Sequence, residues 1–306
     1  MSAVAATDDL ASTERALHLL ELEIGRKLDG FIQGEHPSAW PGPGSDAGEA
    51  RAYEPGDDVR RIDWSLTARS GEVAVRDTLA ERELETWFVV DGSASLDFGT
   101  ARVEKRDLAA SVVAAFGFLT VRAGNRFASV ISDGVDLRTL PPRTGRSAVV
   151  DLVTRLRRRP RGSGQAATLA DALARVRRLA RRPGLVVVVS DLLDDSDWGA
   201  ELRRLSARHE VIVAQVTDPR EDNLPDVGVL ALVDPETGER REVQTSSRRL
   251  RERYAQAAAS RRAGIDDALR AGRAEVIRVG TDEDWLRSVV RHVAGRRRRS
   301  TRRARR

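Results

Sequence analysis

The chain has 306 residues, which is enough to bury a full hydrophobic core in one large domain or two modest ones. It contains no cysteine and only 4 histidines, so disulfides, thiolate zinc sites and cysteine nucleophiles are excluded and a bound metal would need oxygen ligands. The net charge is +5, but residues 296–306 hold eight arginines and no acid, and without those eight charges the chain would carry −3.

The N-terminal residues lack a basic start followed by an apolar stretch, so no secretory signal peptide is predicted. The longest apolar run, residues 184–189, is far too short to cross a bilayer. The expectation is therefore a soluble, cytoplasmic protein without a transmembrane segment.

Residues 1–84 are predicted to form a smaller N-terminal α+β segment that packs on the main domain. Apolar residues at helical spacing predict a helix over residues 13–28, and prolines and glycines predict a loop over residues 34–48. Farther along, Ile62 and Trp64 follow a turn and lie among charged residues, and we expect both to insert into a core. We interpret this stretch as a structural clamp rather than a separate binding site.

From residue 85 to residue 293 strand and helix patterns alternate, which predicts an α/β domain. Strands are predicted at residues 86–90, 126–131, 135–140, 185–190, 211–216 and 274–279, with a hairpin over 227–244. Helices are predicted at residues 102–122, 145–158, 168–181, 246–271 and 281–293, with a further helix capped by Ser196. Residues 185–190 are a continuous β-branched run, typical of a central strand buried on both faces. The alternation indicates a doubly wound, mostly parallel sheet.

Oxygen-bearing side chains follow two of these strands. Asp91, Ser93 and Ser95 lie just beyond the first strand of the domain, and Asp191 lies just beyond the central one. In an open parallel sheet, ligands gather at the carboxyl ends of the strands, near the point where the strand order reverses. The hydroxyl of Thr168, at the start of a helix, is expected to face the same edge. Carboxylate and hydroxyl oxygens suit a small hard cation such as Mg²⁺.

This chain resembles von Willebrand factor A domains. The five residues occur in the order typical of the metal-ion-dependent adhesion site of those domains: Asp91, Ser93, Ser95, Thr168 and Asp191. The resemblance implies that Ser93, Ser95 and Thr168 bind Mg²⁺, with Mn²⁺ or Ca²⁺ as alternatives. It also implies that Asp91 and Asp191 bind the ion directly or through water, and that a carboxylate of a partner protein fills the remaining position.

Two alternatives to this metal site stay open. The family usually places glycines immediately before the threonine, whereas Gln165-Ala166-Ala167 stands here, so Ser163 is an alternative to Thr168 as the third hydroxyl ligand. Aspartate and serine after a strand are also common loop and cap formers, and the same residues could serve only that purpose.

A second resemblance covers roughly residues 15–293. Residues 47–69 are similar to the signature of domain-of-unknown-function family fifty-eight, a bacterial family that joins this motif to a von Willebrand A-like domain. Further matches are Arg76, Glu81, Arg82, Asp218, Pro219, Arg220, Leu224, Pro225, Asp234, Pro235, Thr281, Asp284 and Trp285. The family is often associated with MoxR-type AAA ATPases, and the resemblance implies an adaptor that works with such an ATPase in protein remodelling or complex assembly.

The leading expectation is therefore a non-enzymatic protein that binds a partner's carboxylate through the metal. A metal-dependent phosphoester hydrolase is the alternative, since bound Mg²⁺ can activate water. An acid–base pair is missing for that chemistry, because His209 is expected at the opposite edge of the sheet. The carboxylates nearest the site, Asp194, Asp195 and Asp197, can equally cap the next helix.

Residues 294–306 are predicted to be a disordered, arginine-rich tail, because they hold almost no apolar side chain. Arginine runs bind polyanions through counterion release. Contact with nucleic acid, anionic lipid or an acidic partner surface is the corresponding hypothesis, and nucleic-acid binding through this tail is the third candidate function.

Overall fold

The computed structural model describes residues 18–23, 50–55, 59, 62–76, 85–100, 103–132, 136–159, 167–233 and 239–304. Within the helix predicted at residues 13–28, only residues 18–23 are described, and they are helical. The predicted loop at residues 34–48 and the alternative ligand Ser163 lie outside the described residues.

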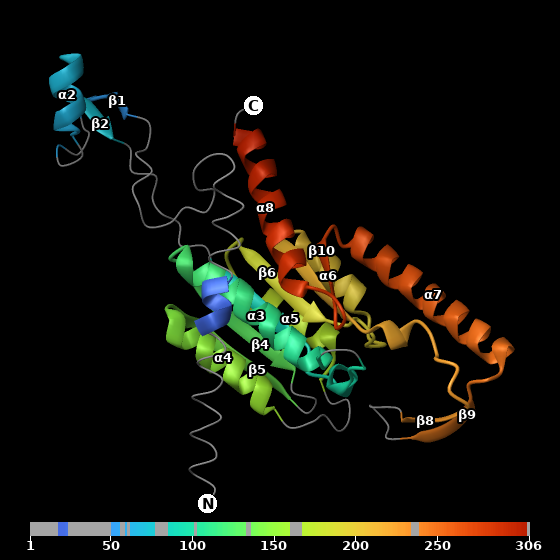
Figure 1. Ribbon diagram of the computed structural model, residues 1–306. Helices are drawn as coiled ribbons and strands as arrows, with labels where there is room; N and C mark the ends of the chain where they lie inside the picture. Colours follow the sequence, from blue (N-terminus) through green and yellow to red (C-terminus); the bar gives the residue numbers. More distant parts are fainter. Residues whose placement is uncertain are drawn as a thin grey trace, which may run out of the picture.

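The centre of the molecule is a six-stranded sheet in the order β10-β7-β6-β3-β4-β5 (Figure 1). Its strands are β3 (Glu85–Val90), β4 (Arg126–Ser132), β5 (Leu137–Arg143), β6 (Leu185–Ser190), β7 (Glu210–Thr217) and β10 (Glu275–Gly280). The edge strand β5 runs antiparallel to β4, and all other neighbours are parallel. From β3 the chain continues to β4 and β5 on one side, and it then crosses over so that β6 pairs with β3 on the other side. The predicted doubly wound, mostly parallel sheet is confirmed, and its strand order reverses between β3 and β6.

Helices cover both faces of this sheet. One apolar core joins the sheet to α3 (Lys105–Arg122), α4 (Arg146–Arg158) and α8 (Trp285–Ala304). The other core joins it to α5 (Leu169–Leu179), α6 (Trp198–Ser206) and α7 (Arg248–Ala271). Side chains alternate along β3, so that Phe88 belongs to the first core and Trp87 to the second. Burial on both faces explains why β3 and β6 are almost entirely apolar.

Helix α8 is longer than predicted. It was expected to end at Val293, before a disordered tail, whereas its backbone is helical from Trp285 to Ala304. Arginine and alanine are good helix formers, and Gly295 is the only glycine in this stretch, so a helix begun on the sheet can continue into the basic segment. No helix in the described part of the chain is long and apolar enough to span a membrane.

The predicted N-cap of α6 is also corrected. Asp197 caps this helix by accepting a hydrogen bond from Ala200 N at 3.2 Å. Ser196, the predicted cap, instead accepts a hydrogen bond from Ala170 N at 3.3 Å, at the start of α5. The two helices compete for polar side chains in one loop, and the sequence alone does not show which helix each side chain serves.

A small α+β unit contains β1 (Ala50–Ala52), α2 (Trp64–Ser70) and β2 (Ala74–Arg76), and in Figure 1 it lies apart from the six-stranded sheet. Asp63 caps α2, with Ser65 N at 3.0 Å from its Oδ1. Trp64 is 69% exposed, so the prediction that it enters a core was wrong. The cap places Trp64 on the outer first turn, and Val75 of β2 takes the buried position.

The predicted hairpin after β7 is present as β8 (Val229–Val233) and β9 (Arg240–Gln244), which pair antiparallel. Its turn at residues 234–238 lies outside the described residues. The 3-10 helix η3 (Pro219–Glu221) precedes the hairpin, directly after β7.

Candidate functional site

Two of the predicted metal ligands meet at the point where the strand order reverses. Asp91 follows β3 and Asp191 follows β6, and these strands are neighbours in the sheet. Asp91 N donates to the carbonyl of Val189 at 2.9 Å, which continues the pairing by one residue. Ser190, next to Asp191, donates from its Oγ to Asp91 Oδ2 at 2.6 Å. The prediction that both carboxylates lie at this carboxyl edge therefore agrees with the strand register.

The loop after β3 carries the two predicted serine ligands. Asp91 Oδ1 accepts a hydrogen bond from Ser93 N at 2.8 Å, which folds the loop back over the carboxylate. The hydroxyls of Ser93 and Ser95 lie 2.9 Å apart. Ser93 precedes the 3-10 helix η2 (Ala94–Asp97), but its side chain makes no cap bond to that helix. Both hydroxyl oxygens therefore belong to one small polar group beside Asp91.

Thr168 lies at the same edge but is engaged in a helix cap. Ala167, one residue earlier, accepts a hydrogen bond from Ser132 Oγ at the end of β4 (3.0 Å). Thr168 Oγ1 accepts from Asp171 N at 3.1 Å and donates to Asp171 Oδ2 at 2.7 Å, as a capping box for α5. The role of Thr168 as a metal ligand stays a prediction, since ligation would require its hydroxyl to give up one of these partners.

Lys105 is a central charge of this edge and was not among the predicted site residues. Lys105 begins α3, and its Nζ lies 2.7 Å from Asp191 Oδ2 and also contacts Glu221 in η3. Burial alone would lower the pKa of Lys105, but Asp191 and Glu221 raise it above its ordinary value, so the ammonium stays charged. The one available signal was composition, because Lys105 is one of only two lysines among 52 basic residues.

The environment of Asp91 favours a nearby cation. Burial and the negative charge of Asp191 raise the pKa of Asp91 to about 6, although hydrogen bonds from Ser190 and Ser93 lower it. The raised pKa means that the ionised carboxylate of Asp91 has too little positive charge around it. A metal ion beside it would lower this pKa again. Asp91, Asp191 and Glu221 together carry three negative charges when ionised, against one positive charge on Lys105.

This donor set fits a hard divalent cation. Asp91, Asp191 and the two serine hydroxyls offer only oxygen atoms, which Mg²⁺, Mn²⁺ and Ca²⁺ accept. We call Asp91, Asp191, Glu221 and Lys105 the carboxyl-edge cluster. When its three carboxylates are ionised the cluster has a net charge of −2, which one divalent cation would balance. In the described part of the chain, no three His, Cys, Asp or Glu side chains converge on a metal position, so a cation at this edge would depend on the serine hydroxyls as well as on Asp91 and Asp191.

A further buried carboxylate anchors the far end of the loop after β3. Asp218, just after β7, accepts hydrogen bonds from Thr100 N (2.8 Å), Thr100 Oγ1 (2.6 Å) and Thr281 Oγ1 (2.7 Å). Burial raises the pKa of Asp218, but hydrogen bonds from Thr100, Arg220 and Thr281 outweigh it and hold the pKa below its ordinary value. Asp218 thus ties the loop after β3 to the ends of β7 and β10.

Two of the three aspartates considered for hydrolytic chemistry are engaged in hydrogen bonds at helix starts. Asp194 accepts hydrogen bonds from Leu169 N (2.8 Å) and Ser196 N (2.6 Å), and Asp197 caps α6. His209 precedes β7 and therefore lies at the amino edge of the sheet, as predicted. Asp197 thus has the predicted alternative role of capping the next helix, whereas Asp194 bonds to the start of α5 instead.

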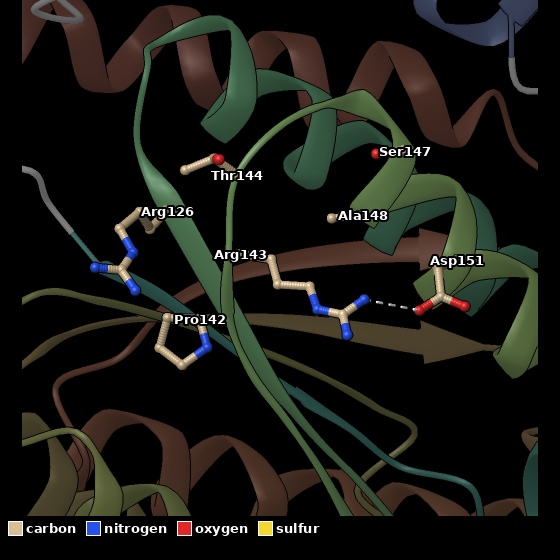
Figure 2. Close-up of a pocket in the computed structure, with 7 residues that line it drawn as sticks. All are labelled: Arg126, Pro142, Arg143, Thr144, Ser147, Ala148 and Asp151. Carbon is tan, nitrogen blue, oxygen red and sulfur yellow. Dashed lines mark ion pairs between the residues drawn. The ribbon is translucent and has the colours of Figure 1, made fainter.

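An open cleft of about 750 Å³ lies at the opposite, amino edge (Figure 2). Arg126 at the start of β4 and Arg143 at the end of β5 line it, together with Thr144, Ser147 and Asp151 around the start of α4. Arg143 lies 3.6 Å from Asp151. None of the predicted site residues lines this cleft.

The fold and the carboxyl-edge cluster define an α/β domain with a polar site at the switch point of its sheet. This chain belongs to the family "Protein of unknown function DUF58", whose model matches residues 49–264. It is 46% identical over 284 residues to the uncharacterized protein Mb1516 of Mycobacterium bovis, covering 92% of this chain and 89% of that one. The family resemblance expected from residues 47–69 is thereby confirmed.

Solved structures with similar folds include BatB from Bacteroides thetaiotaomicron, a conserved hypothetical protein, at 13% identity and a TM-score of 0.45. That match covers 69% of this chain and 98% of BatB. The von Willebrand A domain of SpRpn10 matches at 12% identity and a TM-score of 0.39, covering 68% of this chain and 93% of that domain. The fold class itself is established by the strand order and helix layers of this chain.

Proposed function

We propose that this chain is a non-enzymatic adaptor, located in the cytoplasm, that binds a carboxylate of a partner protein through a divalent cation at the carboxyl edge. The observation that carries the proposal is the placement of Asp91 and Asp191 at the switch point, beside the facing hydroxyls of Ser93 and Ser95. Mg²⁺ is the favoured ion, because it binds oxygen ligands and keeps some waters that an outside carboxylate can replace.

The proposed partner is a MoxR-type AAA ATPase, on the basis of the family resemblance. In this scheme the adaptor holds a client or the ATPase through the cation, and the ATPase supplies the energy for remodelling or assembly. A binding role is supported by Asp194 and Asp197, whose carboxylates are engaged in hydrogen bonds at helix starts and do not face the candidate ligands as a reserve for catalysis.

The first test is direct cation binding. Isothermal titration with Mn²⁺ and Mg²⁺ should give one site per chain in the wild-type protein and none in Asp91→Ala. The matched control is Asp195→Ala, which removes an exposed carboxylate from the same edge and should bind the ion as the wild type does. Equal binding by Asp91→Ala and wild type would place the cation elsewhere and contradict the proposed site.

The second test concerns the partner. Binding of the purified MoxR-type ATPase from the same genome should require Mg²⁺, and it should be lost in excess chelator and in Asp91→Ala. Binding that persists in both conditions would contradict a metal-bridged contact. A protein that binds Mn²⁺ but not the ATPase would keep the cation site and reject this partner.

A further inference from the structure

Lys105 occupies a position that is unfavourable for a cation unless it has a function there. Its side chain is fully buried, and lysine is rarely buried without a partner. It is also the first residue of α3, where the positive end of the helix dipole disfavours positive charge. Both costs are offset by the two carboxylates that the ammonium contacts, those of Asp191 and Glu221, and by the Phe98 ring 5.9 Å away.

Asp191 has two competing roles. It accepts a hydrogen bond from Lys105 Nζ at 2.7 Å, and it is also a predicted ligand of the divalent cation. An ammonium and a divalent cation beside the same carboxylate repel each other, so the two compete for the negative charge of Asp191. Glu221 offers Lys105 a second anchor on another element, so the ammonium need not be left unpaired when Asp191 turns to a metal.

We propose that Lys105 is an internal counter-cation that holds Asp191 in the metal-free protein and sets the affinity of the site for divalent ions. This inference rests on the proposed cation site. When the ion binds, Asp191 exchanges the ammonium for the metal, and Glu221 retains Lys105. The lysine is thus a positioning residue for Asp191, and it keeps the carboxyl edge assembled until an ion arrives.

The exchange reaches beyond the site through η3. Glu221 Oε2 accepts a hydrogen bond from Asp218 N at 3.1 Å, and Asp218 holds Thr100 at the end of the loop after β3. A change at Lys105 and Glu221 is therefore connected to the loop that carries Ser93 and Ser95. Ion binding should alter hydrogen-exchange protection at residues 98–100 and 218–222, besides the ligand loop itself.

The decisive variant is Lys105→Met, which keeps the length of the side chain and removes its charge. In chelator its melting temperature should fall well below that of the wild type, because two carboxylates lose their buried partner. Mn²⁺ should raise its melting temperature more than it raises that of the wild type. In titration calorimetry Mn²⁺ should bind on the order of tenfold more tightly, since one competing positive charge is gone.

Two further variants keep the test decisive. The double variant Lys105→Met, Glu221→Gln removes one carboxylate together with the ammonium. It should fold even if Lys105→Met alone does not, and it should still bind Mn²⁺ more tightly than the wild type. Arg106→Met is the matched control, because Arg106 pairs with Asp97 at 3.1 Å instead of Asp191 and its loss should leave the Mn²⁺ affinity unchanged.

The outcomes separate this inference from the proposed function. If the wild type binds Mn²⁺ and folded Lys105→Met binds it equally or more weakly, the counter-cation role is wrong and the cation site stands. If neither protein binds Mn²⁺ or Mg²⁺, both the inference and the proposed function are overturned. Tighter binding in Lys105→Met with unchanged binding in Arg106→Met supports the exchange.

Discussion

The two edges of the six-stranded sheet carry charge in different ways. At the carboxyl edge the Lys105 and Asp191 side chains are 0% and 1% exposed and are held within a network of hydrogen bonds. At the amino edge the cleft is lined by Arg143 and Asp151, whose side chains are 57% and 36% exposed. Buried charges must be compensated by the protein itself, whereas exposed ones are compensated by water and salt.

This difference decides which edge is the better functional candidate. A cleft can be large and still offer only solvated side chains, each free to move away from a ligand. A buried set of carboxylates with leftover negative charge has a fixed geometry and a specific electrostatic need. The contrast predicts that substitutions at the carboxyl edge have large effects on folding and cation binding, and that those at the amino edge have small ones.

The largest effect is expected for Asp218→Ala. The substitution removes one buried acceptor from Thr100 and Thr281, and we expect a loss of about 3 kcal/mol in the free energy of unfolding. Urea denaturation measures it. The matched control is Asp222→Ala, which breaks a partly exposed ion pair with Arg262 and should cost less than about 1 kcal/mol. Equal losses in the two variants would mean that Asp218 does not anchor the loop.

The next effect concerns Gly92, which lies between Asp91 and Ser93. A Cβ at this position would lie 1.8 Å from the carbonyl oxygen of Ser132, so the loop and the end of β4 must separate. We expect Gly92→Ala to cost about 2 kcal/mol and to weaken cation binding. Gly264→Ala is the control. Gly264 lies in α7, where the added methyl would meet no atom within 4 Å apart from the backbone of its own helix, and the substitution should leave stability unchanged or raise it.

Much of the fold followed from local pattern. The β-branched run at residues 185–190 is a central strand, as predicted. The alternation of strand and helix patterns correctly predicted the α/β fold class and most of the element bounds. Asp91 and Asp191 could be placed together because both follow parallel strands. That inference needed only topology, and no side-chain detail.

What could not be predicted depended on contacts between distant parts of the chain. Lys105 and Asp191 are 86 residues apart, and no spacing rule connects them. Asp218 was noticed as a family match, but its bonds to Thr100 and Thr281 need three loops to meet at one edge. Two local predictions failed. The hydrophobicity of Trp64 predicted burial, but the cap at Asp63 places Trp64 on the exposed first turn of α2. The charge of residues 294–306 predicted disorder, but their helix propensity lets α8 continue to Ala304.

A smaller, graded effect should appear with pH. The pKa of Asp218 is lowered in the fold, so its charge stabilises the protein above its unfolded pKa, near 3.8, and that contribution is lost as the pH falls through the folded value. The stability difference between wild type and Asp218→Asn should therefore be constant near neutral pH and shrink below about pH 4. Urea midpoints at several pH values measure it, and a difference that does not shrink in acid contradicts the charged role.

The smallest effect is expected at the amino edge. Arg143→Ala breaks an ion pair of 3.6 Å between two exposed side chains, and Asp151 keeps Arg155 as a second partner at 2.9 Å. We expect a change below about 0.5 kcal/mol, further reduced by salt, and no change in Mn²⁺ affinity. Urea denaturation at low and high salt and calorimetric titration check both. A loss above about 1 kcal/mol, or altered cation binding, would mean that the two edges are coupled through β4 and β5, because these paired strands run from Arg143, opposite Phe127, to Ser132, opposite Leu137.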